Sequence, residues 1–152
     1  MPKAPSNLPD HLGYWLRKLS NSVSSSFSDR LADHDVSVPQ WVVLRILFDH
    51  DSLPLKEIVT RVEVDQGSLS RMVDRLIVRG WVRRETDNND RRAIAVSLTP
   101  EGRKLVPKLA AEADRNDSHF FSSLSPTERD RFLAAIQKLL AHHQSDSRSP
   151  TD

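Results

Sequence analysis

Short polar residues and arginines gather in one stretch near the middle of the chain, at Gln66, Ser68, Ser70, Arg71 and Arg75. Serine and glutamine side chains can hydrogen-bond to base edges in the major groove of DNA, and one arginine can form two hydrogen bonds to a guanine. The short side chains would also let a helix backbone come close to the bases. The pattern indicates a helix that reads DNA bases, although the same residue types are typical of a helix face exposed to solvent.

The apolar residues within this stretch predict the helix that would position these side chains. They recur at i, i+3, i+4 and i+7, which gives one buried stripe; they are Leu69, Met72, Val73 and Leu76. Asp65 is a suitable N-cap, and Gly80 suits the left-handed position that follows a helix. We therefore expect a helix from Gln66 to Arg79, with its polar side chains away from the stripe.

Two strands are expected directly after this helix, at Trp81–Glu85 and Ile94–Leu98. In the second of them, Ile94, Val96 and Leu98 alternate with smaller residues, as in a strand that buries one face. The sequence therefore predicts a β-hairpin packed through one side of its second strand.

The polar loop between the strands, Thr86–Ala93, would carry Asp90, Arg91 and Arg92 at its tip. An arginine there can contact a phosphate or enter the minor groove, and a nearby carboxylate can orient its guanidinium. A shorter predicted helix, Lys56–Val62, precedes the longer one. Two helices joined by a tight turn and followed by a hairpin form a winged helix-turn-helix, whose second helix enters the major groove.

These residues resemble the motifs of the MarR family of transcriptional regulators. The wing motif is matched by Asp90–Arg92, Val96–Thr99 and Glu101–Gly102, and the recognition helix and its exit by Ser70–Leu76 and Arg79–Val82. The resemblance extends over roughly Leu8–His143, nearly the whole chain. It implies a DNA-binding regulator that is not an enzyme.

The resemblance also implies roles for individual residues. The positions that would face the major groove are Ser68, Ser70, Arg71 and Arg75. Arg92 would be the wing arginine, with Asp90 orienting it. Two positions depart from the family pattern: Pro54 stands where a Ser or Thr N-cap is common, and Glu63 stands where the turn between the two helices often has Gly. A non-Gly residue in the left-handed region costs about 1 kcal/mol, so the geometry of that turn is in question.

Composition is consistent with a DNA partner through the distribution of charge. The net charge is only +1, but residues 54–104 carry eleven Lys and Arg against eight Asp and Glu, while each flank is slightly acidic. Cysteine is absent, which excludes disulfides and thiolate ligands. The 152 residues suffice for one domain, and neither a membrane-length apolar run nor a signal-peptide pattern is present, so we expect a cytoplasmic protein.

The flanking segments predict a mainly helical fold. Apolar residues at near-heptad spacing run from Leu12 to Phe27, and a capping box at Ser125–Glu128 opens a last amphipathic helix. The expected architecture is mainly α with a small β-hairpin wing. It comprises a winged helix-turn-helix core at 38–99, dimerisation helices at 8–37 and 100–143, and disordered tails at 1–7 and 144–152.

The long helices offer more apolar surface than one chain can cover, although a monomeric bundle could turn those stripes inward. The family resemblance implies a homodimer paired through the terminal helices. Two recognition helices about one helical turn apart would read a palindromic operator. We expect a repressor that binds double-stranded DNA, with no membrane contact.

Sequence motifs of enzymes and cofactor sites are absent. The six histidines show no ligand spacing beyond the adjacent His142 and His143, and no nucleophile elbow or phosphate-binding glycine loop is found. We expect no catalytic residue, no cofactor and no metal. Two alternatives stay open: a regulator of the same fold that responds to a His-bound metal, and a winged-helix protein-interaction module without specific DNA binding.

Four residues suggest a pocket for a small aromatic or anionic effector. Asn21 and Ser24 belong to a run of small polar residues in the first long helix, and Trp41 and Arg45 lie one turn apart on the next. In proteins that this chain resembles, such ligands bind between the dimer frame and the DNA-binding lobe. An indole ring, an arginine and hydroxyls would suit them, but Trp41 as a core residue and Arg45 as a surface ion-pair partner fit equally well.

Overall fold

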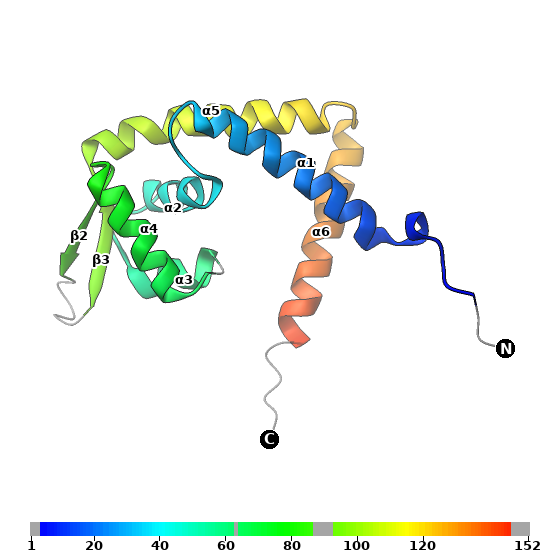
Figure 1. Ribbon diagram of the computed structural model, residues 1–152, viewed down its shortest axis with the longest axis horizontal. Coiled ribbons are helices and arrows are strands. Elements are labelled where there is room, and N and C mark those ends of the chain that lie inside the picture. The colour runs from blue at the N-terminus through cyan, green and yellow to red at the C-terminus, as the bar shows by residue number, and fades with distance from the viewer. Residues whose placement is uncertain (1–3, 63, 87–92, 147–152) are drawn as a thin grey trace, which may run out of the picture. The chain divides into compact units, whose positions relative to one another are not determined.

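The computed structural model describes residues 4–62, 64–86 and 93–146 (Figure 1). It contains two compact units, of which the first ends at Asn116 and the second begins at Asp117. In chain order, the first unit holds η1 (Leu8–Asp10), α1 (Leu12–Ala32), α2 (Val38–Phe48), β1 (Leu53–Pro54), α3 (Leu55–Val62), α4 (Gln66–Val78), β2 (Val82–Thr86), β3 (Ile94–Leu98) and the start of α5 (Pro100–Phe121). The predicted mainly helical fold with a small β wing is confirmed.

Local sequence signals set the ends of the helices around the wing. The Ser37 hydroxyl accepts from the Gln40 amide at the start of α2, and the Gln40 side chain accepts from the Ser37 amide, which forms a capping box. At the end of α4, Gly80 has φ +75°, so it takes the left-handed position as predicted. The Trp81 amide bonds to the Leu76 carbonyl and the Gly80 amide to that of Ile77, which satisfies the last carbonyls of the helix.

The sheet has three antiparallel strands in the order β1-β3-β2, one more than the predicted hairpin. The additional strand, β1, pairs Leu53 with Val96. The predicted one-sided burial of β3 is wrong in part, because Ala95 and Ser97 are buried while Ile94 is 40% exposed. The Arg83 side chain of β2 covers Ser97 by donating to its hydroxyl, and β1 is too short to reach Ile94.

A single apolar core joins the helices and the sheet of the first unit. Its fully buried side chains include Leu44 and Leu47 of α2, Ile58 of α3, Leu69, Val73 and Leu76 of α4, Val96 of β3, and Val106 and Leu109 of α5. Complete burial of one such side chain contributes about 1.5–3 kcal/mol to folding. Three residues of the predicted α4 stripe are therefore confirmed as core, and the fourth, Met72, is half-buried. The inner face of α4 is thereby fixed, which turns its polar face outward.

The second unit consists of the end of α5 and the helix α6 (Pro126–Asp146). The predicted capping box opens α6: the Ser125 amide donates to the Glu128 carboxylate, and the Ser125 hydroxyl accepts from the Glu128 amide. The hydrogen bond from the Ser125 amide is the main reason why the pKa of Glu128 lies below its ordinary value, and the Ser125 hydroxyl beside the carboxylate adds to it. Arg129 pairs with Asp117 at 3.1 Å, so the first turn of α6 is fastened to the end of α5.

Both predicted tails include residues that are ordered in the structure. The C-terminal tail was placed at 144–152, but α6 continues through Asp146, because neither Gly nor Pro interrupts the sequence before Pro150. Near the other end, the Ser6 hydroxyl lies 3.0 Å from a ring nitrogen of His11, so part of the predicted tail is held in place. Residues 1–3 and 147–152 lie outside the described residues. In the part that is described, no helix has the length and apolarity needed to cross a membrane.

Candidate nucleic-acid interface

The first turn of α4 is organised around the Asp65 carboxylate. It accepts from the Ser68 amide at 2.8 Å, as predicted for an N-cap, and from the Ser68 hydroxyl at 2.6 Å. These two bonds hold the pKa of Asp65 below its ordinary value. The Ser68 hydroxyl in turn accepts from Arg71 Nη2 at 3.2 Å. Ser68 thus links the cap to the first arginine of the helix.

The other predicted base-reading residues lie on the outer side of α4. Gln66, Arg71 and Arg75 are exposed, and Ser70 is half-buried. Neither arginine forms an ion pair within the described ranges, so both guanidinium groups have donors left to bind a partner. The exposed surface of α4 therefore presents both cationic and amide hydrogen-bonding groups.

The start of α4 and the base of the wing are close in space. Gln66 lines a shallow hollow together with Lys56 of α3 and with Ala93 and Ile94 at the wing end of the sheet. The wing tip itself, with Asp90, Arg91 and Arg92, lies outside the described residues, as does Glu63 in the turn between α3 and α4. The hollow shows that a ligand lying on the start of α4 would also reach the base of the wing.

A salt bridge braces the wing against the recognition helix. Arg84 of β2 donates to Asp74 of α4 at 2.8 Å. The next residue back, Arg83, pairs with Glu85 at 2.9 Å and also donates to the Ser97 hydroxyl at 3.1 Å. The two arginines of β2 are thus engaged within the fold, which distinguishes them from Arg71 and Arg75.

The exit of α4 is fastened to the first turn of α5. The Thr99 hydroxyl donates to the Gly80 carbonyl at 2.6 Å and accepts from the Gly102 amide at 3.1 Å. The Thr99 amide donates to the Trp81 carbonyl. A Cβ atom at Gly102 would lie only 2.1 Å from that carbonyl oxygen, so only glycine allows this approach. The Thr and Gly of the motif in this sequence therefore hold the end of the recognition helix.

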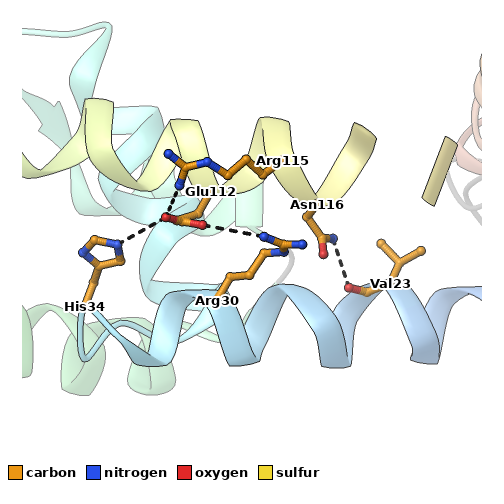
Figure 2. Close-up of polar contacts among 6 residues, drawn as sticks. All are labelled: Val23, Arg30, His34, Glu112, Arg115 and Asn116. Atoms are coloured by element: carbon orange, nitrogen blue, oxygen red, sulfur yellow. Dashed lines mark hydrogen bonds and ion pairs between the residues drawn. The ribbon is translucent and has the colours of Figure 1, made fainter. Parts of the chain in front are cut away.

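A second charged cluster joins α1 to α5 within the first unit (Figure 2). The Glu112 carboxylate of α5 contacts Arg115, Arg30 at 4.0 Å and His34 at 3.8 Å. The hydrogen bond from Arg115 is the main reason why the pKa of Glu112 lies below its ordinary value, and the charges of Arg115, His34 and Arg30 add to it. Three basic side chains converge on this carboxylate.

Beside this cluster, Asn116 is only 3% exposed and donates to the Val23 carbonyl of α1 at 3.2 Å (Figure 2). Its Oδ1 atom and the Nε atom of Arg30 are buried without a hydrogen-bond partner among the described residues. Each of these two atoms can therefore bind a further polar partner, such as a water molecule or a ligand.

The four predicted effector-binding residues are not gathered around one cavity of the described structure. Trp41 packs edge-on against Phe27 of α1, with 6.2 Å between ring centroids. Arg45 is turned away from it, because it pairs with Asp49 at 2.7 Å and lies over the Phe48 ring. Asn21 and Ser24 are exposed on α1. This pocket therefore stays a prediction, in which Trp41 of α2 packs against α1 whereas Arg45 pairs with Asp49 at the end of its own helix.

Comparison with known proteins identifies the family. A family model described as MarR family matches residues 36–94, which span α2 to the start of β3. The chain belongs to the MarR family.

Two curated MarR-like relatives are transcriptional regulators. TtmR of Methylorubrum extorquens is 32% identical over 69% of this chain, which spans only 54% of TtmR. The transcriptional repressor NicR of Pseudomonas putida is 27% identical over 92% of this chain and 89% of its own length. Members of this family are DNA-binding regulators rather than enzymes, as the sequence predicted.

Two solved structures share the MarR fold over most of this chain. BpsR of Bordetella bronchiseptica, whose DNA binding is regulated by 6-hydroxynicotinic acid, superposes with TM-score 0.82 at 28% identity, over 90% of this chain and 97% of BpsR. A MarR variant from Escherichia coli in complex with operator DNA superposes with TM-score 0.79 at 25% identity, over 85% and 93% of the two chains. This MarR-family chain is a transcriptional regulator with a winged-helix fold.

Several contacts of this MarR-family site were not predicted from the sequence. The sequence shows that Asp74 and Arg84 have opposite charges, but it does not show that their side chains meet across the turn between α4 and β2. The cluster of Arg30, His34 and Glu112 depends on how α1 lies along α5. Among the described residues no group of three His, Cys, Asp or Glu side chains is placed to hold a metal ion.

Proposed function

We propose that this MarR-family regulator represses transcription as a homodimer on a palindromic operator, from which a small aromatic or anionic effector releases it. The observation that carries the DNA-binding part is the exposed side of α4, which presents Gln66, Arg71 and Arg75 and begins beside the wing base at Gln66. A regulator that binds operator DNA in this way would act in the cytoplasm.

Within this proposal the side chains of α4 divide into readers and supports. Arg71 and Arg75 make no ion pair within the described part of the chain, so they can contact guanine edges without first breaking one. The Ser68 hydroxyl already donates to Asp65 and accepts from Arg71, so its role is to orient Arg71. Ser70, which is half-buried, is free to make a short contact to a base or a phosphate.

The wing would add contacts to the DNA backbone. Asp90, Arg91 and Arg92 follow β2 in the sequence, and β2 is braced to α4 through Arg84 and Asp74. In the proposed complex, Arg91 and Arg92 would contact neighbouring phosphates or the minor groove, with Asp90 orienting Arg92.

Exposed apolar residues support a homodimer. On α1, Leu12 is 86% exposed, and its apolar neighbours Trp15, Leu16 and Leu19 are also uncovered. On α6 the exposed apolar residues are Phe132, Leu133, Leu139 and Leu140. Such runs on long helices mark protein–protein contacts. Light scattering of the purified protein should give twice the 17.3 kDa mass of one chain at micromolar concentration, and a monomer would contradict the proposal.

The effector part of the proposal rests on the surplus of positive charge around Glu112. Arg30, His34 and Arg115 surround one carboxylate, and the buried Arg30 Nε and Asn116 Oδ1 offer a free donor and acceptor. An anionic aromatic molecule could place its carboxylate near Arg30 and its ring toward Phe27, which lies one helical turn earlier on α1 and touches Trp41. Binding there would favour a dimer whose recognition helices no longer match the operator.

The deciding experiment is selection of random duplex DNA on the purified protein, followed by sequencing. We expect an enriched inverted repeat whose half-sites lie about one helical turn apart. The enriched duplex should bind at least a thousandfold more tightly than a scrambled duplex at the same salt concentration, in the range of specific regulators. Titration with benzoate, with 6-hydroxynicotinic acid and with benzamide as the uncharged control then tests release. Enrichment of no sequence would overturn specific DNA binding and favour the protein-interaction alternative.

A further inference from the structure

Arg103, in the first turn of α5, holds the C-terminal end of α2. Its Nη1 atom donates to the Phe48 carbonyl at 3.2 Å, and its Nη2 atom donates to the His50 carbonyl at 3.0 Å. Its guanidinium also lies over the Phe48 ring, 6.0 Å from the centroid. Carbonyl groups at a helix C-terminus lack partners within the helix and carry partial negative charge, so a guanidinium suits them. A single side chain thereby joins elements more than fifty residues apart.

The same turn of α5 also holds the end of α4. Thr99 bonds to the Gly80 and Trp81 carbonyls through its hydroxyl and its amide. Gly102 makes room for the Trp81 carbonyl. The start of α5 is therefore fastened at two points: at the exit of the recognition helix and at the end of α2. These two attachments, together with the buried Val106 and Leu109 of α5, fix the orientation of the lobe on α5.

Further along, α5 is fastened to α1. Glu112 contacts Arg30 and His34, and Asn116 bonds to the Val23 carbonyl. All these residues belong to the first compact unit. A change in how α1 and α5 pair would therefore be passed along α5 to both helices of the DNA-binding lobe, and it would reach α2 through Arg103.

We propose that Arg103 is a positioning residue for operator recognition, because it fixes the orientation of the helix-turn-helix on α5 and hence the spacing between the two recognition helices of a dimer. This inference rests on the proposed function as an operator-binding homodimer. Without the guanidinium, the lobe stays attached at Thr99 and Gly102 and through the apolar core around Val106 and Leu109, but the end of α2 is no longer held to α5 by these hydrogen bonds. A looser lobe adapts to half-sites at other distances, so selectivity for spacing falls more than affinity does.

The test uses the full-length dimer and three duplexes: the selected operator, and the same operator with one base pair added or removed between its half-sites. The variants are Arg103→Met, which keeps a long side chain without charged donors, and Arg103→Lys, which keeps one charged donor. Lys104→Met is the matched control, because Lys104 is the exposed neighbour and pairs only with Glu101 among the described residues. Thermal unfolding checks that each variant is folded.

The preference for the original spacing is the affinity for the selected operator divided by the affinity for the altered operators. We expect this preference to be about tenfold weaker in the Arg103→Met dimer than in the parent, which is the effect of one charge-assisted hydrogen bond. The preference of Arg103→Lys should lie between those of the parent and Arg103→Met, and the preference of Lys104→Met should match that of the parent. If Arg103→Met does not fold, the Arg103→Lys comparison decides. Unchanged spacing preference in a folded Arg103 variant overturns the positioning role while the proposed function stands. A parent protein that selects no spaced inverted repeat overturns both.

Discussion

The arginines of α4 and those around Glu112 are held in opposite ways. Arg71 and Arg75 stand on an exposed helix face without an ion pair in the described part of the chain, whereas Arg30 and Arg115 converge with His34 on one carboxylate. Cations without a partner can bind an incoming polyanion, and in water their desolvation cost is low. Cations that share one carboxylate hold two helices together and respond when that charge changes. In the proposed function, the first set reads DNA and the second set binds the effector.

The largest effect is expected from a substitution in the turn that supports α4 and its exposed arginines. Gly102→Ala would place a Cβ atom 2.1 Å from the Trp81 carbonyl oxygen, so we expect a loss of about 3 kcal/mol or more in the free energy of unfolding. Urea denaturation measures it. Gly13→Ala in α1 is the control, because a Cβ there meets nothing within 4 Å, and it should leave stability equal or slightly higher. Equal stability of the two variants would mean that the Thr99–Gly102 turn does not position α4.

Arg71→Ala tests the reading surface. Loss of a bidentate base contact should weaken operator binding by about 1–3 kcal/mol and relax the base preference at one position in each half-site. Fluorescence anisotropy with the selected operator and its single-base variants measures both effects. Arg131→Ala, which removes an exposed arginine of α6, should bind like the parent. If Arg71→Ala binds like Arg131→Ala, α4 does not read bases through this residue.

Arg92→Ala tests whether the wing contacts the DNA backbone. Removal of one phosphate contact should weaken binding to all duplexes alike and lower the slope of log K against log salt concentration by about 1. Anisotropy titrations at several salt concentrations give the slope. Loss of base preference at a single position, with an unchanged slope, would show instead that Arg92 reads a base.

Glu112→Gln sharpens the contrast by leaving the second cluster without its carboxylate. The positive charges of Arg30 and Arg115 would then repel each other, so the melting temperature should fall, by less than in Gly102→Ala. A benzoate ion should bind the variant more tightly than the parent. Calorimetric titration measures this, with Glu101→Gln as the control, since Glu101 is exposed and pairs with Lys104. Weaker benzoate binding in Glu112→Gln would argue against an anion site beside Arg30.

The smallest effect is expected on the melting temperature at acidic pH. The pKa of Asp65 is lowered in the folded protein by its bonds to Ser68, so its stabilisation is complete above the unfolded-state pKa of about 4 and is lost as the pH falls below it. Asp65→Asn keeps an N-cap but removes the titration. The variant's melting temperature should therefore decline less steeply than the parent's between about pH 5 and pH 2. Parallel curves would contradict this assignment.

Local signals in the sequence predicted much of the DNA-binding lobe. The Asp65 cap, the left-handed Gly80 and the β3 boundaries follow from short-range rules, and the structure has all three. The strand β1 was missed, because two residues that include Pro54 carry no strand pattern. The Arg103 contacts and the Glu112 cluster were also missed. They join residues distant in sequence, and no spacing within one element indicates them.

The candidate effector residues also show that spacing within one element does not predict which residues meet in the fold. Trp41 and Arg45 are one turn apart on α2, and spacing alone placed them together. In the structure, Trp41 meets Phe27, and Arg45 pairs with Asp49 on its own helix. Which neighbour a helical side chain meets depends on the packing of α1 and on rotamers, and neither follows from the sequence of α2.

The sequence separation of the two fastenings of α5 bears on how the chain folds. The Thr99–Gly80 bond closes a segment of 19 residues, whereas Arg103 reaches back 55 residues to Phe48. Shorter closures lose less chain entropy, so the α4–wing–α5 unit is expected to form before the end of α2 docks on it. A contact that forms after the transition state affects the rate of unfolding and not the rate of folding. Substitution of Arg103 should therefore hasten unfolding and leave the folding rate nearly unchanged.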